Sequence, residues 1–145
     1  MKKFKISLIL ITVLFFIVMN SGCTSEPENK TYKSQYMEFQ YPSNLEMEVG
    51  ASNQTVYLKS ASLGLSVKYY DNEKDYLQVK NAIEEDCNFY SGSKELKEVN
   101  GTECEVYTWQ ASYYYRAYCF EKNGKYFIAE GDLIDELDAL IPTIK

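Results

Sequence analysis

Histidine, the side chain that serves most often as a general base and as a metal ligand, is absent from this chain of 145 residues. The serine and threonine hydroxyls therefore lack the usual base for nucleophilic catalysis, and no local motif pairs a serine with a lysine. The sequence accordingly predicts no catalytic residue and no cofactor. An envelope-associated hydrolase is kept as an alternative function.

Two short acidic clusters are the candidates for cation binding. They are Asp71-Asn72-Glu73 and Glu84-Glu85-Asp86, and carboxylate oxygens are the ligands that hard cations prefer. Neither cluster has the ligand spacing of a calcium loop, and a turn and a solvated helix face explain them more simply. We therefore predict no metal site, and a calcium- or manganese-binding surface protein is the second alternative.

Aromatic residues are the candidates for a binding surface. Tyr, Trp and Arg carry much of the binding energy at protein interfaces. Four such residues are expected on one face of a β-hairpin, and these are Tyr107, Trp109, Tyr114 and Arg116. Packing beneath a helix is the other interpretation of the same residues.

The first 23 residues have the three zones of a secretory signal. Three lysines precede an apolar run at residues 6–19, and small residues then lead to Cys23. A helix of that length spans about 21 Å, short of the roughly 30 Å hydrocarbon core of a bilayer. Ser21-Gly22-Cys23 resembles the lipobox of prokaryotic lipoproteins. We predict a lipoprotein-type signal peptide, residues 1–23, with lipidation of Cys23; an uncleaved anchor and a cleaved, unlipidated chain are the alternatives.

Residues 24–33 are polar and charged, and they include a proline, which predicts a flexible tether. Residues 34–145 are then long enough for one domain with one core. The leader removes three lysines, which leaves 12 basic and 21 acidic side chains and a formal charge of −9. This charge argues against nucleic acid. The expected partners are the membrane, through the lipid anchor, and an extracytoplasmic protein or small ligand at the outer side of the cell membrane.

Three cysteines remain in the domain, Cys87, Cys104 and Cys119, and an exported chain commonly oxidises such a set to one disulfide and one free thiol. If strands 102–109 and 114–121 form a hairpin, Cys104 falls opposite Cys119 on the same side of the sheet. We predict the disulfide Cys104–Cys119. A bridge that includes Cys87 and no bridge at all are the alternatives, and a slip of one residue would separate the predicted pair.

Hydrophobic periodicity predicts the elements that position these residues. Strands are expected at residues 36–41, 45–49, 55–59 and 63–69, followed by a helix capped by Asp75. A meander of four more strands follows, with the hairpin signal Asn-Gly at residues 100–101 and 123–124, and then a helix at residues 133–140. This order predicts an antiparallel sheet with two helices packed on it.

A family resemblance points to the same fold. Phe39-Gln40-Tyr41-Pro42 resembles the aromatic-x-Tyr-Pro opening of PsbP-like domains, and the hairpin at residues 123–128 with the acidic helix after it resembles their end. The resemblance covers residues 34–145. It implies an α+β fold with α-β-α layers, and an accessory or binding subunit rather than an enzyme. Photosynthetic members help to retain manganese and calcium at photosystem II, but no ligand set carries over to this chain. The expected function is a non-catalytic binding or accessory module of a surface-anchored lipoprotein.

Overall fold

The structure is a computed structural model that describes residues 28–145. The predicted signal peptide, the lipidation site Cys23 and residues 24–27 of the predicted tether lie outside the described residues. Within the described part, no helix is both long and apolar enough to cross a membrane.

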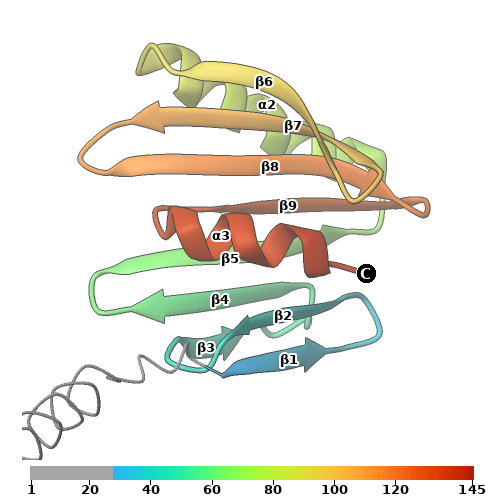
Figure 1. The fold of residues 1–145 in the computed structure, drawn as a ribbon. Helices are drawn as coiled ribbons and strands as arrows, with labels where there is room; N and C mark the ends of the chain where they lie inside the picture. Colours follow the sequence, from blue (N-terminus) through green and yellow to red (C-terminus); the bar gives the residue numbers. More distant parts are fainter. Residues whose placement is uncertain (1–27) are drawn as a thin grey trace, which may run out of the picture.

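The described residues form nine strands, two α-helices and a 3-10 turn (Figure 1). The first half contains β1 (Asn29–Lys33), β2 (Glu38–Pro42), β3 (Glu46–Val49), β4 (Thr55–Ser60), β5 (Leu63–Tyr70) and α2 (Glu73–Phe89). The second half contains β6 (Ser93–Val99), β7 (Thr102–Gln110), β8 (Tyr114–Lys122), β9 (Lys125–Gly131), α3 (Ile134–Leu140) and the turn η1 (Ile141–Thr143). The predicted strands and helices are all present, with bounds shifted by a few residues.

Seven strands form one antiparallel sheet in the order β3-β4-β5-β9-β8-β7-β6. The helix α2 carries the chain from β5 to the far edge, and the chain then returns strand by strand to β9 beside β5 (Figure 1). The strands β1 and β2 form a separate hairpin. The prediction of an α+β fold with an antiparallel sheet and two helices is confirmed.

The two Asn-Gly turns of the meander are formed as predicted. Asn100 and Gly101 have φ of 49° and 74°, and Asn123 and Gly124 have φ of 54° and 72°. Positive φ at both central residues is the geometry that a two-residue hairpin turn needs, and Asn-Gly adopts it at little cost.

The cap of α2 differs from the prediction. The N-cap is Asn72, whose side-chain oxygen accepts a hydrogen bond of 3.0 Å from the backbone N–H of Asp75. Asp75 therefore donates its backbone N–H to the cap and is not itself the cap, and the helix begins two residues earlier, at Glu73. Asn and Asp are equally good caps, so residue type alone does not separate the two positions.

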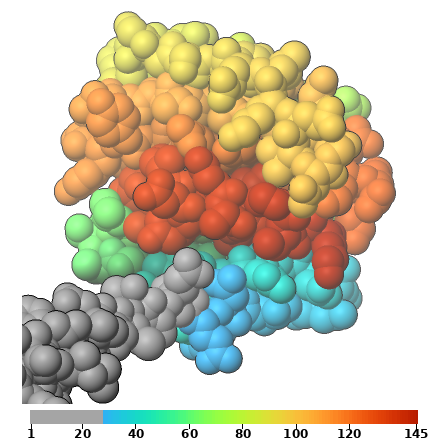
Figure 2. Space-filling view, viewed as in Figure 1, coloured from blue at the N-terminus to red at the C-terminus, as the bar shows by residue number. Residues whose placement is uncertain are grey.

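Each face of the sheet has its own buried cluster. On one face, α3 packs against the sheet together with the β1-β2 hairpin, and Leu137 and Phe39 are fully buried there. Figure 2 shows α3 filling the centre of this face, between the hairpin and the β6–β8 side of the molecule. On the other face, α2 packs on the sheet through Ile83 and Cys87, against Tyr107 and Ile128.

The domain begins earlier than predicted. Residues 29–33, expected in the flexible tether, form β1, which pairs with β2 over its whole length. Tyr32 supplies the apolar contact, because its side chain is buried and its ring lies 5.3 Å from that of Phe39. Of the predicted tether, only residues 24–28 precede the fold.

Candidate binding groove

The hairpin β7-β8 determines where the predicted site residues lie, and its register differs from the prediction by one residue. Gln110 pairs with Tyr114, so the turn between them has three residues instead of the expected four. Cys104 consequently lies opposite Phe120, and Cys119 lies opposite Glu105. Because neighbouring residues of a strand point to opposite faces, this change moves one partner of every predicted pair to the other side of the sheet.

The predicted disulfide Cys104–Cys119 is therefore not formed. Cys104 belongs to the buried cluster under α3, whereas Cys119 belongs to the cluster under α2. Cys87, Cys104 and Cys119 are all buried free thiols. Burial raises the pKa of all three thiols, that of Cys104 to about 11. Each therefore stays protonated at neutral pH.

The predicted aromatic surface is also divided between the two faces. Tyr107 and Trp109 point toward α2, where Tyr107 is fully buried and the Trp109 ring stacks on Tyr115 at 5.6 Å. Tyr114 and Arg116 lie on the opposite face. The Arg116 guanidinium pairs with Asp138 of α3, so only Tyr114, 62% exposed, stands free at the surface. The four residues do not form one patch.

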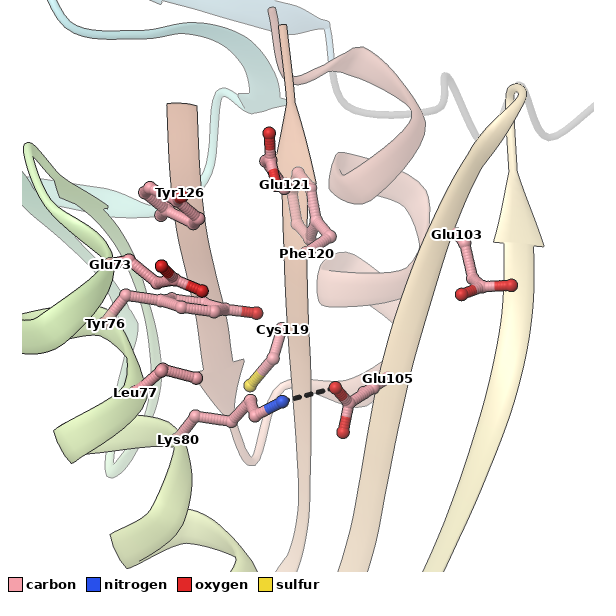
Figure 3. Close-up of a pocket in the computed structure, with 10 residues that line it drawn as sticks. All are labelled: Glu73, Tyr76, Leu77, Lys80, Glu103, Glu105, Cys119, Phe120, Glu121 and Tyr126. Atoms are coloured by element: carbon pink, nitrogen blue, oxygen red, sulfur yellow. Dashed lines mark hydrogen bonds and ion pairs between the residues drawn. The ribbon is translucent and has the colours of Figure 1, made fainter. Parts of the chain in front are cut away.

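The site that the structure does form is a groove between the first turns of α2 and the sheet, with a volume of about 390 Å³. Four residues of α2 line one wall, and their spacing of three and four residues places them on one side of the helix. They are Glu73, Tyr76, Leu77 and Lys80. Figure 3 shows these side chains on the side of α2 that faces the neighbouring strands.

Alternate residues of three strands form the other wall. Glu105 of β7 lies opposite Cys119 of β8, and Glu121 of β8 lies opposite Tyr126 of β9. Glu103 precedes Glu105 by two residues, so it lies on the same face. Phe120 also borders the groove, but its ring belongs to the core under α3 and points away from Cys119 in Figure 3.

Glu105 is the neutralised carboxylate of the groove. It forms ion pairs with Lys80 and, at 2.7 Å, with Lys94, and it accepts a hydrogen bond of 2.8 Å from the Tyr107 hydroxyl. Burial by itself raises the pKa of Glu105, but the hydrogen bonds from Lys80, Lys94 and Tyr107 outweigh it and lower the pKa to about 2. This carboxylate is therefore ionised and held in place at neutral pH.

Three other carboxylates of the groove have no such partner. Glu73, Glu103 and Glu121 are exposed, and none of them forms an ion pair with a described residue. Glu98 of β6 lies directly opposite Glu103. The register of β7 and β8, continued by one residue, places Glu121 on its other side. Like charges in such positions repel one another.

Tyrosine rings and a thiol form the rest of the groove. The ring of Tyr76 stacks on that of Tyr126 with centroids 5.1 Å apart, and Tyr70 meets Tyr76 edge-on at 6.2 Å. Cys119 lies at the base, 1% exposed, and its Sγ makes no hydrogen bond to any described residue. Carboxylates around tyrosine faces favour a cationic group, because the anions attract it and the rings offer cation–π contacts.

The two acidic clusters predicted from the sequence are separate from one another. Asp71 accepts a hydrogen bond from the Gln54 side chain, and Glu84 pairs with Lys94 at 3.4 Å. Glu73 alone reaches the groove. Among residues 28–145, no three His, Cys, Asp or Glu side chains come together in a way that could hold a metal ion.

The groove was not among the predicted sites, although its residues leave a signal in the sequence. Glu103 and Glu105 alternate with Cys104 and Val106, and Glu121 follows Cys119 by two residues. Carboxylates on the face of the sheet that α2 covers indicate that the helix does not extend over them. This can be recognised only when the register of the strands and the position of α2 are known.

Comparison with known proteins supports the class of fold. No protein-family model and no curated protein matches the chain. Among solved structures, the chain is similar to the solution structure of cyanobacterial PsbP (CyanoP) from Synechocystis sp. PCC 6803. The two share 15% sequence identity with a TM-score of 0.56, over 87% of this chain and 96% of that one. The chain therefore has a PsbP-like fold, and the likeness at this identity concerns the fold alone.

Proposed function

We propose that this chain is a non-catalytic binding module, and that its groove receives a cationic group carried by an extracytoplasmic protein. The observation that carries the proposal is the set of three carboxylates, Glu73, Glu103 and Glu121, that border a tyrosine-lined groove and form no ion pair within residues 28–145. Lys80, the cation that lines the groove, is already paired with Glu105. A lysine or arginine side chain of the partner would neutralise them. It would also contact the ring of Tyr126, since Lys80 Nζ already lies 5.9 Å from the centroid of the Tyr76 ring.

The contacts inside the groove favour binding over catalysis. The thiol of Cys119 is the strongest nucleophile there, but burial raises its pKa and keeps it protonated. No base approaches it, because Glu105 is occupied by Lys80, Lys94 and Tyr107. The lining residues offer charge and aromatic surface, which are features of a recognition site.

Anchoring through Cys23 on the outer side of the cytoplasmic membrane is the second part of the proposal. Its support is the basic, apolar and small-residue sequence of residues 1–23. Because β1 begins at Asn29, the chain from Cys23 to the fold spans roughly 20 Å at full extension. The domain would then stay close to the bilayer. The groove is lined by the first turns of α2, which follows the C-terminal end of β5.

Binding can be tested with the full lipoprotein in nanodiscs of phosphatidylcholine, a zwitterionic lipid that does not attract the probe. The probe is a fluorescent hexalysine peptide, followed by anisotropy. We expect saturable binding that weakens as salt rises from 50 to 300 mM, because screening acts on exposed charges. The double variant E103Q/E121Q should bind about fivefold more weakly, which corresponds to about 1 kcal/mol for two exposed carboxylates.

The matched control removes the same charge from the solvent side of α2, with E85Q/D86N. Equal weakening by both double variants would show that net charge, and not the groove, attracts the peptide. Titration with calcium and manganese chloride tests the metal-binding alternative, since tight binding of either ion would overturn the choice of an organic cation.

Mass spectrometry tests the anchor. A wild-type protein with an intact leader and unmodified Cys23 would contradict lipidation, and Cys23→Ala should leave the chain unlipidated.

A further inference from the structure

The outer edge of β6 is an open strand edge. Within residues 28–145, β6 pairs with β7 on one side only and ends the sheet, as Figure 1 shows. Six of its seven residues are exposed, and Leu96 at its centre is 66% exposed. An edge with unpaired N–H and C=O groups is a template for a further strand. We propose that β6 pairs antiparallel with β6 of a second copy of this chain, about a two-fold axis at Leu96. This inference does not depend on the proposed function.

The charge pattern of β6 is self-complementary about that axis. The strand reads Ser-Lys-Glu-Leu-Lys-Glu-Val from residue 93 to residue 99. With Leu96 facing its own copy, Glu95 of each chain lies opposite Lys97 of the other, and Lys94 lies opposite Glu98. Every charged residue of the strand then faces an opposite charge. Directly opposed charges of opposite sign stabilise a strand pair.

Neighbouring registers lack this property. A shift of the axis by half a residue is excluded by the pleat, because it would place residues opposite one another whose side chains point to different faces of the sheet. A move of a whole residue places Glu95 against Glu95 or Lys97 against Lys97. Since both whole-residue shifts put like charges opposite one another, the pleat and the charge pattern together select the register that is centred on Leu96.

The other edge of the sheet provides an internal contrast. The strand β3 has four residues, Glu-Met-Glu-Val, and its only charged side chains are Glu46 and Glu48. Self-pairing about Met47 would place Glu46 against Glu48 twice. Lys59 of β4 pairs with Glu48 at 2.8 Å within the chain, so the β3 edge has no charge pattern that is complementary to its own copy. The longer β6 edge has such a pattern, and self-pairing through β6 about a two-fold axis gives a closed pair.

The Glu95–Lys97 contacts carry most of this argument. Lys94 already contacts Glu105 at 2.7 Å and Glu84 at 3.4 Å within its own chain, so its pairing with the partner's Glu98 competes with existing contacts. Glu95 and Lys97 form no ion pair with a described residue. They point to the α3 side of the sheet, because they lie opposite Val106 and Cys104.

Apolar surface at the start of β6 adds to the interface. Phe89 and Tyr90 are 80% and 44% exposed, and only Ser91 and Gly92 separate them from the strand. The two-fold axis brings this end of one β6 next to Val99 of the other. Exposed apolar surface therefore lies next in sequence to the strand edge that the two copies would share.

Self-crosslinking in the membrane tests the register directly. In the pairing we propose, Leu96→Cys places two thiols on directly opposed residues, whose Cβ atoms lie about 4.5–5.5 Å apart. The control Lys97→Cys sits next to it on the same edge, but the two copies of residue 97 are offset by two positions, about 7 Å along the strands. Oxidation of membranes with copper phenanthroline should convert Leu96→Cys to a covalent dimer about tenfold faster than Lys97→Cys, because only the first pair meets disulfide geometry.

Charge reversal then tests the cause. In the Leu96→Cys background, E95K places lysine against lysine and K97E places glutamate against glutamate, so each should lose crosslinking. The swap E95K/K97E restores complementarity and should regain it. A mixture of the E95K and K97E chains should also crosslink, as a heterodimer. Thermal melting of each variant verifies that the fold is intact.

The proposal is overturned by any of three results. The first is crosslinking of Leu96→Cys at the rate of the Lys97→Cys control. The second is crosslinking that E95K and K97E leave unchanged. The third is a swap variant that melts like the wild type but stays uncrosslinked.

Discussion

The two faces of the sheet bury very different amounts of apolar surface. Among the described residues, 20 form the buried cluster on the α3 side, and only seven form the one on the α2 side. On the α3 side, the β1-β2 hairpin covers the sheet together with α3. The α2 side is covered by one helix, and its uncovered end is the groove.

The α3 side of the sheet mainly stabilises the fold, and the α2 side carries the proposed binding groove. Hydrophobic burial scales with the apolar area removed from water, so the α3 side contributes most of the stability. The α2 side has fewer buried residues, and the end of its strands is given to Glu103, Glu121 and Tyr126 instead of aliphatic residues. We therefore expect truncation of a buried apolar residue to cost more stability on the α3 side than on the α2 side.

The largest effect is expected from Leu137→Ala on the α3 side. Leu137 is fully buried, and its loss leaves a cavity between α3 and the sheet. The free energy of unfolding should fall by about 3–4 kcal/mol, against about 2 kcal/mol for Ile83→Ala in the smaller cluster under α2. Urea denaturation measures both. A larger loss at Ile83 would contradict the division of roles between the faces.

The second effect belongs to the α2 side and depends on pH. Glu105→Gln removes the carboxylate whose folded pKa is about 2, below its ordinary 4.5. A lowered folded pKa stabilises the fold above the unfolded pKa, and this contribution disappears as pH falls from about 5 toward 2. At pH 7 we expect a loss of roughly 2 kcal/mol, reduced from the full linkage value because the side chain is partly solvated.

The control for this prediction is the wild type at low pH. Melting curves of the two proteins should approach each other between pH 5 and pH 2, since protonation of Glu105 removes the same interactions as the substitution. A constant gap across this range would show that Glu105 acts through packing rather than through its charge.

The third effect tests how α3 is held. Asp138 binds the Arg116 guanidinium and accepts a hydrogen bond of 2.9 Å from the Tyr118 hydroxyl. Asp138→Ala leaves both donors without that acceptor, and Tyr118 is 1% exposed. We expect a loss of about 1–2 kcal/mol. Phe substitution of Tyr118 in the same background should recover part of it, and no recovery would mean that Arg116 alone depends on Asp138.

Local signals in the sequence predict most of the fold. Alternating apolar residues and the two Asn-Gly turns place the meander, because positive φ at both turn residues leaves little freedom in the loop. The turn at residues 111–113 has no such signal, and its length was predicted one residue too long. That single residue separates Cys104 from Cys119 and Tyr107 from Tyr114, so every site prediction that used the register failed with it.

Long-range pairing explains the other differences. The strand β1 is polar except for Tyr32, so its composition is typical of a tether. Its order comes from pairing with β2 and from the ring of Phe39, which the local sequence does not reveal. The groove was missed for the same reason, since Glu73 on α2 and Glu121 on β8 meet only in the folded chain.

The smallest expected effect is the most specific test of the groove. Glu103 has Glu98 opposite it on β6, and it has Glu121 beside it on β8. Like charges in such positions destabilise a sheet, so Glu103→Gln should leave the free energy of unfolding unchanged or raise it by about 0.3–0.5 kcal/mol. Added salt should stabilise the wild type more than the variant, because it screens the same repulsion. Glu85→Gln, on the solvent side of α2, is the matched control and should give neither change. A loss of stability at Glu103 of the size expected at Asp138 would show that its carboxylate supports the fold. The two faces of the sheet would then not differ in the way proposed.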